Sequence, residues 1–216
     1  MSEVAKIKTN LPATEAENIA NAASEDAGFE KMMKFKKGDY WLDNREVPHG
    51  TTYIAHAIGW TKTWVHFENG MVVDRKIYRV ARGEKPVERD RLDCLDETTW
   101  PFGLDGKRRM DPWVYQYLLP MEDPKTNEVC LFVTGSFGGR RAVADVCTAW
   151  GRRNVKNPGC GQPIVKLGKA MMPTKHYGDV PRPNFEIVGW DEMQRVVKDV
   201  DVKELSKDQF DDAIPF

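Results

Sequence analysis

The chain has 216 residues, of which 41% are hydrophobic and 30% charged, and its formal net charge is −1. This composition is typical of a globular protein with one core and extensions, or at most two small domains, and it excludes a wholly disordered chain. No apolar run reaches the ~20 residues of a membrane-spanning helix, and residues 1–30 lack a signal-peptide pattern. We therefore expect a cytoplasmic protein with no membrane partner.

Charge is segregated along the chain. Residues 1–30 carry two basic and six acidic side chains, and residues 191–216 carry four basic and eight acidic ones, so each end has a net charge of −4. Residues 31–190 carry 26 basic and 19 acidic side chains, a net charge of +7. A basic body between acidic ends is expected of a polyanion-binding protein whose tails compete for its own binding surface. Charges scattered over a solvated surface are the alternative.

The first half of the chain predicts an arm and a hairpin. Residues 1–33 are expected to form a mobile N-terminal arm, because the first 30 are rich in Ala, Asn, Glu and Ser with little apolar periodicity. Residues 51–67 and 71–80 are dense in β-branched and aromatic side chains and are separated by a turn at Asn69-Gly70. This pattern predicts two long strands joined as a hairpin.

The middle of the chain predicts a loop, a second hairpin and a helix. Residues 81–112 contain charges, prolines and glycines and are expected to form a long loop or insertion. Residues 113–121 and 129–136 read as a second hairpin. Residues 140–153 place Val143, Val146, Cys147 and Trp150 at helical spacing, after Gly138-Gly139 and with Gly151 near the end.

Two more strands and a helix complete the predicted elements. Residues 163–168 and 184–190 read as short strands, and residues 191–207 as a helical linker with an approximate capping box at its start. The order β-β-β-α-β-β predicts a mainly β fold with α: a small barrel like the oligonucleotide/oligosaccharide-binding (OB) fold over residues 34–190, with terminal extensions. Other small mixed sheets share this order of elements.

Aromatic and basic side chains alternate on the predicted strands, as sequence-independent binding of single-stranded nucleic acid requires. On the first predicted strand, Trp60, Lys62 and Trp64 should share one face, with His66 next on that face. On the second, Lys76 and Tyr78 should share one face, and Arg75 and Arg79 the other. Further cations lie in the 107–109 loop and at both ends of the predicted helix. The candidate DNA-binding residues are Trp60, Lys62, Trp64, Arg75, Lys76, Tyr78, Arg79, Arg108, Arg109, Arg140, Arg141, Arg152 and Arg153.

Core packing is the alternative use of these rings. For Trp60 and Trp64 stacking on bases and packing in the barrel are both open, whereas the row of Trp113, Tyr115 and Tyr117 favours the core. Either way, one face of each strand must point inward.

The sequence contains no recognisable catalytic or cofactor motif. The cysteines and histidines lack metal-ligand spacing, and no phosphate-binding glycine motif or nucleophile elbow is present. The four cysteines lie far apart, which predicts reduced, mostly buried thiols. We expect neither a cofactor nor a metal, although Asp74, Glu84, Asp90 and Asp93 could in principle hold Mg²⁺ in a nuclease.

The C-terminal residues 209–216 end in two acids, Asp211 and Asp212, followed after Ala213 by Ile214, Pro215 and Phe216. An apolar tip with a free carboxylate is suited to capture in a partner's pocket, and Pro215 lowers the entropy lost on docking. The segment resembles the acidic tip, Asp-Asp-Asp-Ile-Pro-Phe, of bacterial and bacteriophage single-stranded-DNA-binding proteins. Ala213 stands in place of the third acid, and the family's long Gly/Pro/Gln-rich linker is absent. A terminal edge strand is the alternative.

The resemblance implies a tip, residues 208–216, that recruits replication, recombination and repair proteins. Together with the basic body it predicts a nonenzymatic protein that coats single-stranded DNA. The partner-binding residues would be Asp211, Asp212, Ile214, Pro215 and Phe216. A metal-dependent DNA-processing nuclease with a recruitment tip and a protein-binding adaptor are the alternatives, and assembly into a homo-oligomer is left open.

Overall fold

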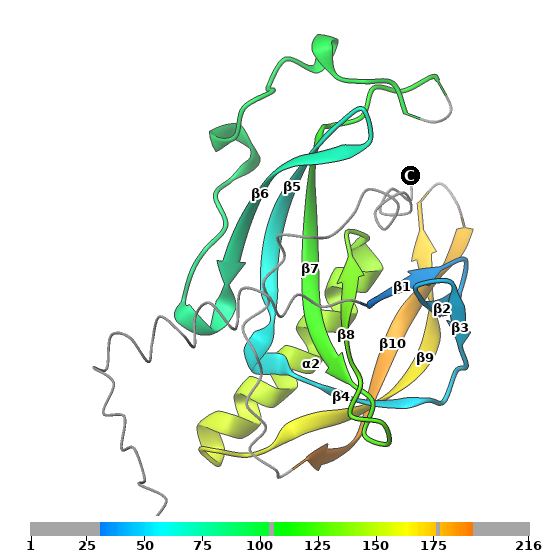
Figure 1. Cartoon of the computed structure of the whole chain (residues 1–216), viewed down its shortest axis with the longest axis vertical. Coiled ribbons are helices and arrows are strands. Elements are labelled where there is room, and N and C mark those ends of the chain that lie inside the picture. Colours follow the sequence, from blue (N-terminus) through cyan, green and yellow to red (C-terminus); the bar gives the residue numbers. More distant parts are fainter. Residues whose placement is uncertain (1–30, 104–105, 176–177, 192–216) are drawn as a thin grey trace, which may run out of the picture.

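The computed structural model of the chain describes residues 31–103, 106–175 and 178–191. These residues form ten β-strands and one α-helix (Figure 1). The strands are β1 (Met32–Lys36), β2 (Asp39–Leu42), β3 (Arg45–Val47), β4 (Thr52–Ala55), β5 (Thr61–Glu68), β6 (Met71–Arg79), β7 (Trp113–Glu122), β8 (Val129–Thr134), β9 (Gln162–Thr174) and β10 (Gly178–Asp191), and the helix is α2 (Phe137–Lys156). The predicted class, mainly β with a helix, is confirmed.

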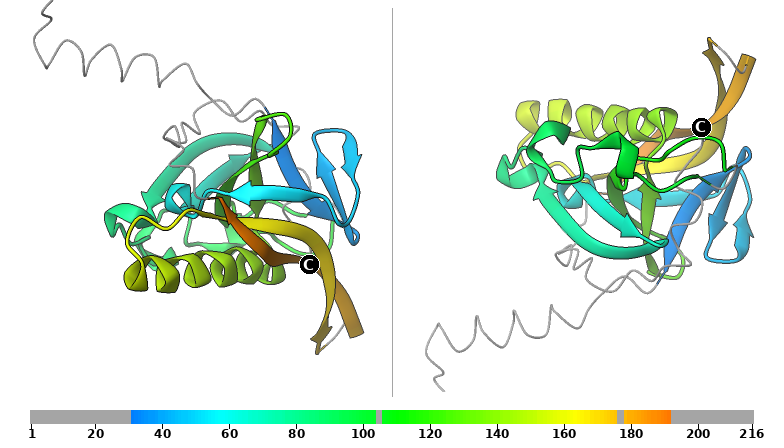
Figure 2. Two further views of the ribbon diagram at one scale, coloured as in Figure 1. Left: turned by 90° about the horizontal axis from the view of Figure 1, so that it is seen from below. Right: turned by 90° about the horizontal axis from the view of Figure 1, so that it is seen from above.

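All ten strands belong to one sheet that curls into a half-barrel (Figures 1 and 2). The main path is β10-β9-β4-β7-β8-β1-β2-β3, and the β5–β6 hairpin joins it at β7. Only β1 and β8 pair in parallel; the other pairs are antiparallel. The curl is compatible with a small barrel. The predicted order of three or four strands, a helix and two strands is not confirmed, because eight strands precede α2.

The first three strands have no counterpart in the prediction. They lie at one end of the sheet, where β1 pairs with both β2 and β8. Met32 and Met33, which were assigned to the mobile arm, belong to β1 and are buried. The predicted arm therefore extends too far, and residues 1–30 lie outside the described part of the chain.

The strand predicted over residues 51–67 is interrupted at His56–Trp60. A short 3-10 turn, η1 (Ala57–Gly59), separates β4 from β5. Both strands lie along the same edge of β7, and the backbone N–H of His56 donates to the carbonyl oxygen of Pro120 at 2.9 Å. On their other sides, however, β4 pairs with β9 and β5 pairs with β6. The break allows one edge of β7 to serve two different neighbours.

Both predicted hairpins are present. Asn69 and Gly70 join β5 to β6 with positive φ values of 51° and 71°, the conformation that a two-residue hairpin turn requires. The β7–β8 hairpin spans the residues expected for it. The strands β9 and β10 also pair, and they are longer than predicted and form a hairpin that projects from the body (Figure 2).

The helix α2 includes the predicted segment and extends beyond it at both ends. The hydroxyl oxygen of Ser136 caps its start by accepting a hydrogen bond from Gly139 N at 3.1 Å. Gly138 and Gly139 therefore lie in the first turn instead of before it. A Cβ on Gly139 would lie 1.9 Å from Thr134 Oγ1, so only glycine allows this turn to pack on β8.

Apolar side chains fill both sides of the sheet. The larger core cluster includes Val143, Val146 and Cys147 of α2, and this helix runs along one side of the sheet (Figure 2). A smaller cluster, Met32, Leu118, Leu131 and Val133, lies between β1, β7 and β8. In residues 31–191, apart from the two short gaps, no helix is long and apolar enough to cross a bilayer.

Candidate nucleic-acid interface

The strands β6, β5 and β7 align aromatic and basic side chains in rows. Lys62 is opposite Tyr78 on β6 and Tyr117 on β7, and the next row is Lys76, Trp64 and Tyr115. A third row holds Asp74, His66 and Trp113. Because alternate residues of a strand share a face, all three rows lie on the same side of the sheet. The predicted same-face sets are therefore confirmed, and the register brings them side by side.

The rings of adjacent rows are in contact. The ring centroids of Trp64 and Tyr115 are 4.8 Å apart, those of Tyr115 and Tyr117 are 5.6 Å apart, and those of Tyr117 and Trp60 are 5.3 Å apart. These four side chains are half-buried, whereas the alternate residues of β5, such as Thr63, are fully buried. A continuous line of partly exposed rings thus covers part of β5 and β7, as a base-stacking surface requires.

Cations lie against these rings. The Lys62 ammonium is 5.1 Å from the Trp60 ring centroid and 5.5 Å from that of Tyr117. The Arg140 guanidinium reaches from the first turns of α2 to 5.3 Å from the Tyr115 ring. Among the described residues neither Lys62 nor Arg140 has a carboxylate partner, so cation–π contacts hold both charges beside the rings. Lys76 lies 5.2 Å from the Trp113 ring and pairs with Asp74 at 3.0 Å.

We call this surface the aromatic–cationic face. Its members are half-buried side chains of β5, β6, β7 and α2, together with the residue that precedes β5. They are Trp60, Lys62, Trp64, Lys76, Tyr78, Tyr115, Tyr117 and Arg140. Burial, with a smaller contribution from Tyr117, raises the pKa of the Tyr115 phenol, which therefore stays neutral across the physiological range.

Trp113 was expected to pack in the core together with Tyr115 and Tyr117. It is buried, with 3% of its surface exposed. Tyr115 and Tyr117, for which the same was expected, are half-buried, and Tyr117 packs against the larger core cluster, as Trp60 does. Sequence periodicity could place the three rings on one side of β7, but not show how deeply each ring would be buried.

Arg75 and Arg79 lie on the other side of β6, as their spacing predicted. They are opposite Val65 and Thr61, whose side chains are buried. Burial lowers the pKa of Arg75 to about 10. These two candidates are therefore not part of the aromatic–cationic face, and a single strand lying on that face would not reach them.

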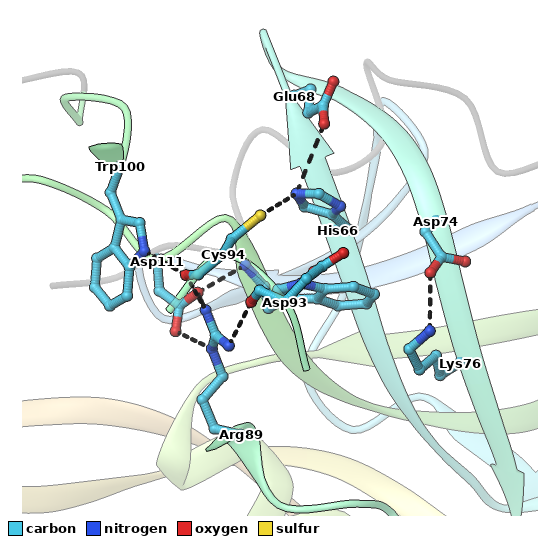
Figure 3. A network of polar contacts seen from close by, with 10 residues as sticks. His66, Glu68, Asp74, Lys76, Arg89, Asp93, Cys94, Trp100 and Asp111 are labelled. Carbon is cyan, nitrogen blue, oxygen red and sulfur yellow. Dashed lines mark hydrogen bonds and ion pairs between the residues drawn. The ribbon is translucent and has the colours of Figure 1, made fainter. Parts of the chain in front are cut away.

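The loop between β6 and β7 is anchored to the end of this face by Arg89 (Figure 3). Its guanidinium donates two hydrogen bonds to the carboxylate of Asp111, at 2.7 and 2.8 Å. It also donates to the carbonyl oxygens of Asp93 and Cys94, both at 2.9 Å. The hydrogen bond to Asp111 raises the pKa of Arg89, so the loop is fastened by a permanently charged group.

The third row completes this anchor. The indole N–H of Trp113 donates to Asp93 Oδ1 at 2.6 Å, which lowers the pKa of Asp93. The Trp113 ring stacks on His66 with ring centroids 4.7 Å apart. His66 Nε2 in turn lies 3.7 Å from the Cys94 thiol (Figure 3). Nearby, the indole N–H of Trp64 donates to the carbonyl oxygen of Val87 at 3.0 Å. No sequence pattern predicted these contacts, although the loop is rich in charged residues.

The other basic candidates are spread over the molecule. Arg108 and Arg109 are exposed in the β6–β7 loop, and Arg141 is exposed on α2 with its Nε 3.9 Å from Asp145 Oδ2. Arg152 and Arg153 lie near the opposite end of α2 from Arg140, where Arg153 packs 4.5 Å from the Trp190 ring. These basic candidates therefore do not form one site. Asp211, Asp212, Ile214, Pro215 and Phe216, like the linker 191–207 after its first residue, lie outside the described residues.

Three of the four carboxylates considered as magnesium ligands accept hydrogen bonds from other groups. Asp74 pairs with Lys76, Glu84 accepts from the backbone of Arg79, and Asp93 accepts from Trp113. The described residues contain no group of three or more His, Cys, Asp or Glu side chains placed to hold a metal ion.

Comparison of the chain with protein-family models, with curated proteins and with solved structures found no match.

Proposed function

We propose that this chain binds single-stranded DNA through the aromatic–cationic face. The observation that carries the proposal is the pair of cross-strand rows, Tyr78–Lys62–Tyr117 and Lys76–Trp64–Tyr115, in which each row places one cation beside two rings on a half-buried surface. Rings supply stacking to any base, and cations neutralise the phosphates between them. No base-specific contact is required, so binding is tolerant of sequence. In this proposal the curled sheet serves as an OB-like barrel.

The start of α2 adds to the electrostatic attraction. Arg140 lies in the first turns of the helix, whose N-terminal end carries a partial positive charge. The Tyr115 ring beneath its guanidinium holds the charge close to the stacking surface. A phosphate beside Tyr115 would meet both the guanidinium and the helix terminus.

The second half of the proposal concerns the C-terminal tip. The resemblance of residues 209–216 to the tips of single-stranded-DNA-binding proteins supports recruitment of replication, recombination and repair enzymes. Replacing Phe216 with Ala should abolish this recruitment without changing DNA affinity. Deleting residues 208–216 should instead raise DNA affinity at low salt, because a tethered anion is removed. Identical behaviour of the full-length and truncated proteins would contradict this role of the tip.

A titration with oligo-dT tests the DNA-binding half. Tryptophan fluorescence should change on binding because Trp60 and Trp64 belong to the face, and the oligonucleotide should remain intact with and without Mg²⁺. Cleavage with Mg²⁺ would identify a nuclease instead. A fluorescence signal that does not respond, together with unchanged oligonucleotide mobility, would favour a protein-binding adaptor.

A further inference from the structure

The β6–β7 loop carries a short hairpin, which we call the finger and which is described at residues 102–103 and 106–109. Phe102 and Arg109 form an antiparallel bridge, and the backbone N–H of Gly103 donates to the carbonyl oxygen of Arg108 at 2.8 Å. Gly106 takes a positive φ of 62° at the turn and donates to Gly103 O at 2.9 Å. The loop arches beyond the ends of β5, β6 and β7 (Figure 1).

The finger combines an exposed ring with cations. Phe102 is 58% exposed, and the Arg109 guanidinium lies 4.5 Å from its ring centroid. Lys107, Arg108 and Arg109 follow one another and are all exposed. An exposed ring is unfavourable in water unless a partner covers it, and adjacent cations select an anionic partner. Stacking on a base and neutralising its phosphates meets both requirements.

Hydrogen bonds hold the finger in place relative to the aromatic–cationic face. Arg109 Nη1 donates to the carbonyl oxygen of Trp100 at 2.6 Å, and the indole N–H of Trp100 donates to Cys94 O at 2.7 Å. Arg89 donates to the same Cys94 oxygen, and Asp93 binds the indole of Trp113, one row from Trp64 and Tyr115 (Figure 3). Because these contacts already order the finger, a strand that reaches it loses little entropy.

We propose that the finger is a second contact for the same single strand, in which Phe102 stacks on a base beyond the face and Lys107, Arg108 and Arg109 bind the adjoining phosphates. This inference rests on the proposed function. A membrane surface is also anionic and also accepts aromatic side chains. The finger is connected by hydrogen bonds to Trp113, whose ring lies 5.2 Å from the Lys76 ammonium of the aromatic–cationic face, and this connection favours nucleic acid.

The test is the dependence of affinity on oligonucleotide length. Wild-type protein, Phe102→Ala and a variant with Lys107, Arg108 and Arg109 changed to Ser are titrated with oligo-dT of increasing length. Leu95→Ala is the control, because this side chain is 56% exposed in the same loop but has no ring. Oligonucleotides of about six nucleotides should bind all four proteins equally, whereas those of about 15 should bind the first two variants at least ~5-fold more weakly than wild type and control.

The outcomes separate this inference from the proposed function. If wild-type protein binds no oligonucleotide of any length, the proposed function is wrong. If wild-type protein binds and the finger variants show the same increase in affinity with oligonucleotide length, the finger does not contact DNA. The proposed function is then unaffected. If the variants lose binding to phosphatidylserine vesicles but not to oligo-dT, the finger contacts a membrane and the inference is overturned.

Discussion

Trp64 on β5 and Tyr115 on β7 lie directly opposite each other, with ring centroids 4.8 Å apart and planes inclined by 42°. Both are half-buried, and each touches a different neighbouring element. Trp64 donates to the β6–β7 loop through Val87, and Tyr115 lies under Arg140 of α2. This pair therefore marks the place where the sheet, the loop and the helix meet on the aromatic–cationic face.

Replacing Trp64 with Ala should weaken oligo-dT binding by roughly 5- to 150-fold, the equivalent of ~1–3 kcal/mol for one stacked base. The salt dependence should hardly change, because stacking is not ionic. Trp41→Ala is the matched control, since Trp41 lies on β2 at the far end of the sheet path. Fluorescence anisotropy at several salt concentrations measures both quantities. If Trp64→Ala unfolds the protein and the milder Trp64→Leu folds and binds like wild type, Trp64 only packs the fold.

Arg140 and Arg141 are adjacent in sequence but should behave differently. Arg140 lies on the Tyr115 ring, whereas Arg141 has a side chain 63% exposed and lies near Asp145. Arg140→Ala should weaken binding and reduce the slope of log K against log salt by about 0.7, the value for one phosphate contact on a single strand. Arg141→Ala should change neither by a comparable amount. Equal effects would mean that cations of α2 act only through the general field.

Gly139 should not tolerate alanine. A Cβ at this position would overlap Thr134, whose Oγ1 would be 1.9 Å away, so Gly139→Ala should lower the free energy of unfolding by about 1–3 kcal/mol. Gly151→Ala is the control in the same helix, because no atom lies within 4 Å of its added Cβ, and it should raise stability by about 0.5–1 kcal/mol. Urea unfolding measures both. A neutral Gly139→Ala would show that the start of α2 does not pack on Thr134 as described.

The loop anchor should loosen in acid. The indole N–H of Trp113 lowers the pKa of Asp93 below its ordinary value of 3.8, so the folded state favours the ionised carboxylate. This stabilisation is complete above the unfolded pKa and is lost as pH falls through the lower folded value. The backbone amides of residues 89–100 should therefore exchange faster at pH 3 than at pH 5 by more than the change in intrinsic exchange rates accounts for. These two pH values lie on either side of the ordinary pKa of Asp, about 4. Asp93→Asn should remove this extra acceleration. A wild-type loop whose protection is unchanged by acid would contradict the role of Asp93.

Local features of the sequence predicted those parts of the fold that depend on local interactions. Asn69-Gly70 specified the turn between β5 and β6, and the apolar spacing of Val143, Val146 and Cys147 identified the buried side of α2. The alternation of Lys62 and Trp64 along β5 placed them on one face before their neighbours were known. These signals follow from the periods of strands and helices and need no knowledge of partners.

Features that depend on distant partners could not be predicted. The break at His56–Trp60 exists because β4 and β5 pair with different strands, β9 and β6, beside the same edge of β7. The strand predicted over residues 184–190 is only the second half of β10, which begins at Gly178 and includes Pro181 and Pro183. Because β10 is an edge strand, the missing N–H groups of these prolines are tolerated.

The candidate site was only partly foreseeable for the same reason. The sequence predicted which side chains share a face, but not that Arg140 would lie on Tyr115 or that burial would lower the pKa of the half-buried Arg75. Arg89 was indistinguishable from its charged neighbours until its contacts with Asp111 and the Asp93–Cys94 backbone were known.

Photo-cross-linking tests the central claim most directly. Oligo-dT containing 5-iododeoxyuridine is bound to the protein and irradiated, and the modified residues are located by mass spectrometry. We predict adducts on Trp64, Tyr115 or Tyr117, and their loss when the salt concentration is raised enough to dissociate the complex. Adducts confined to β1–β3 or to the β9–β10 hairpin, with none on the aromatic–cationic face, would contradict the assignment of this surface as the DNA-binding site.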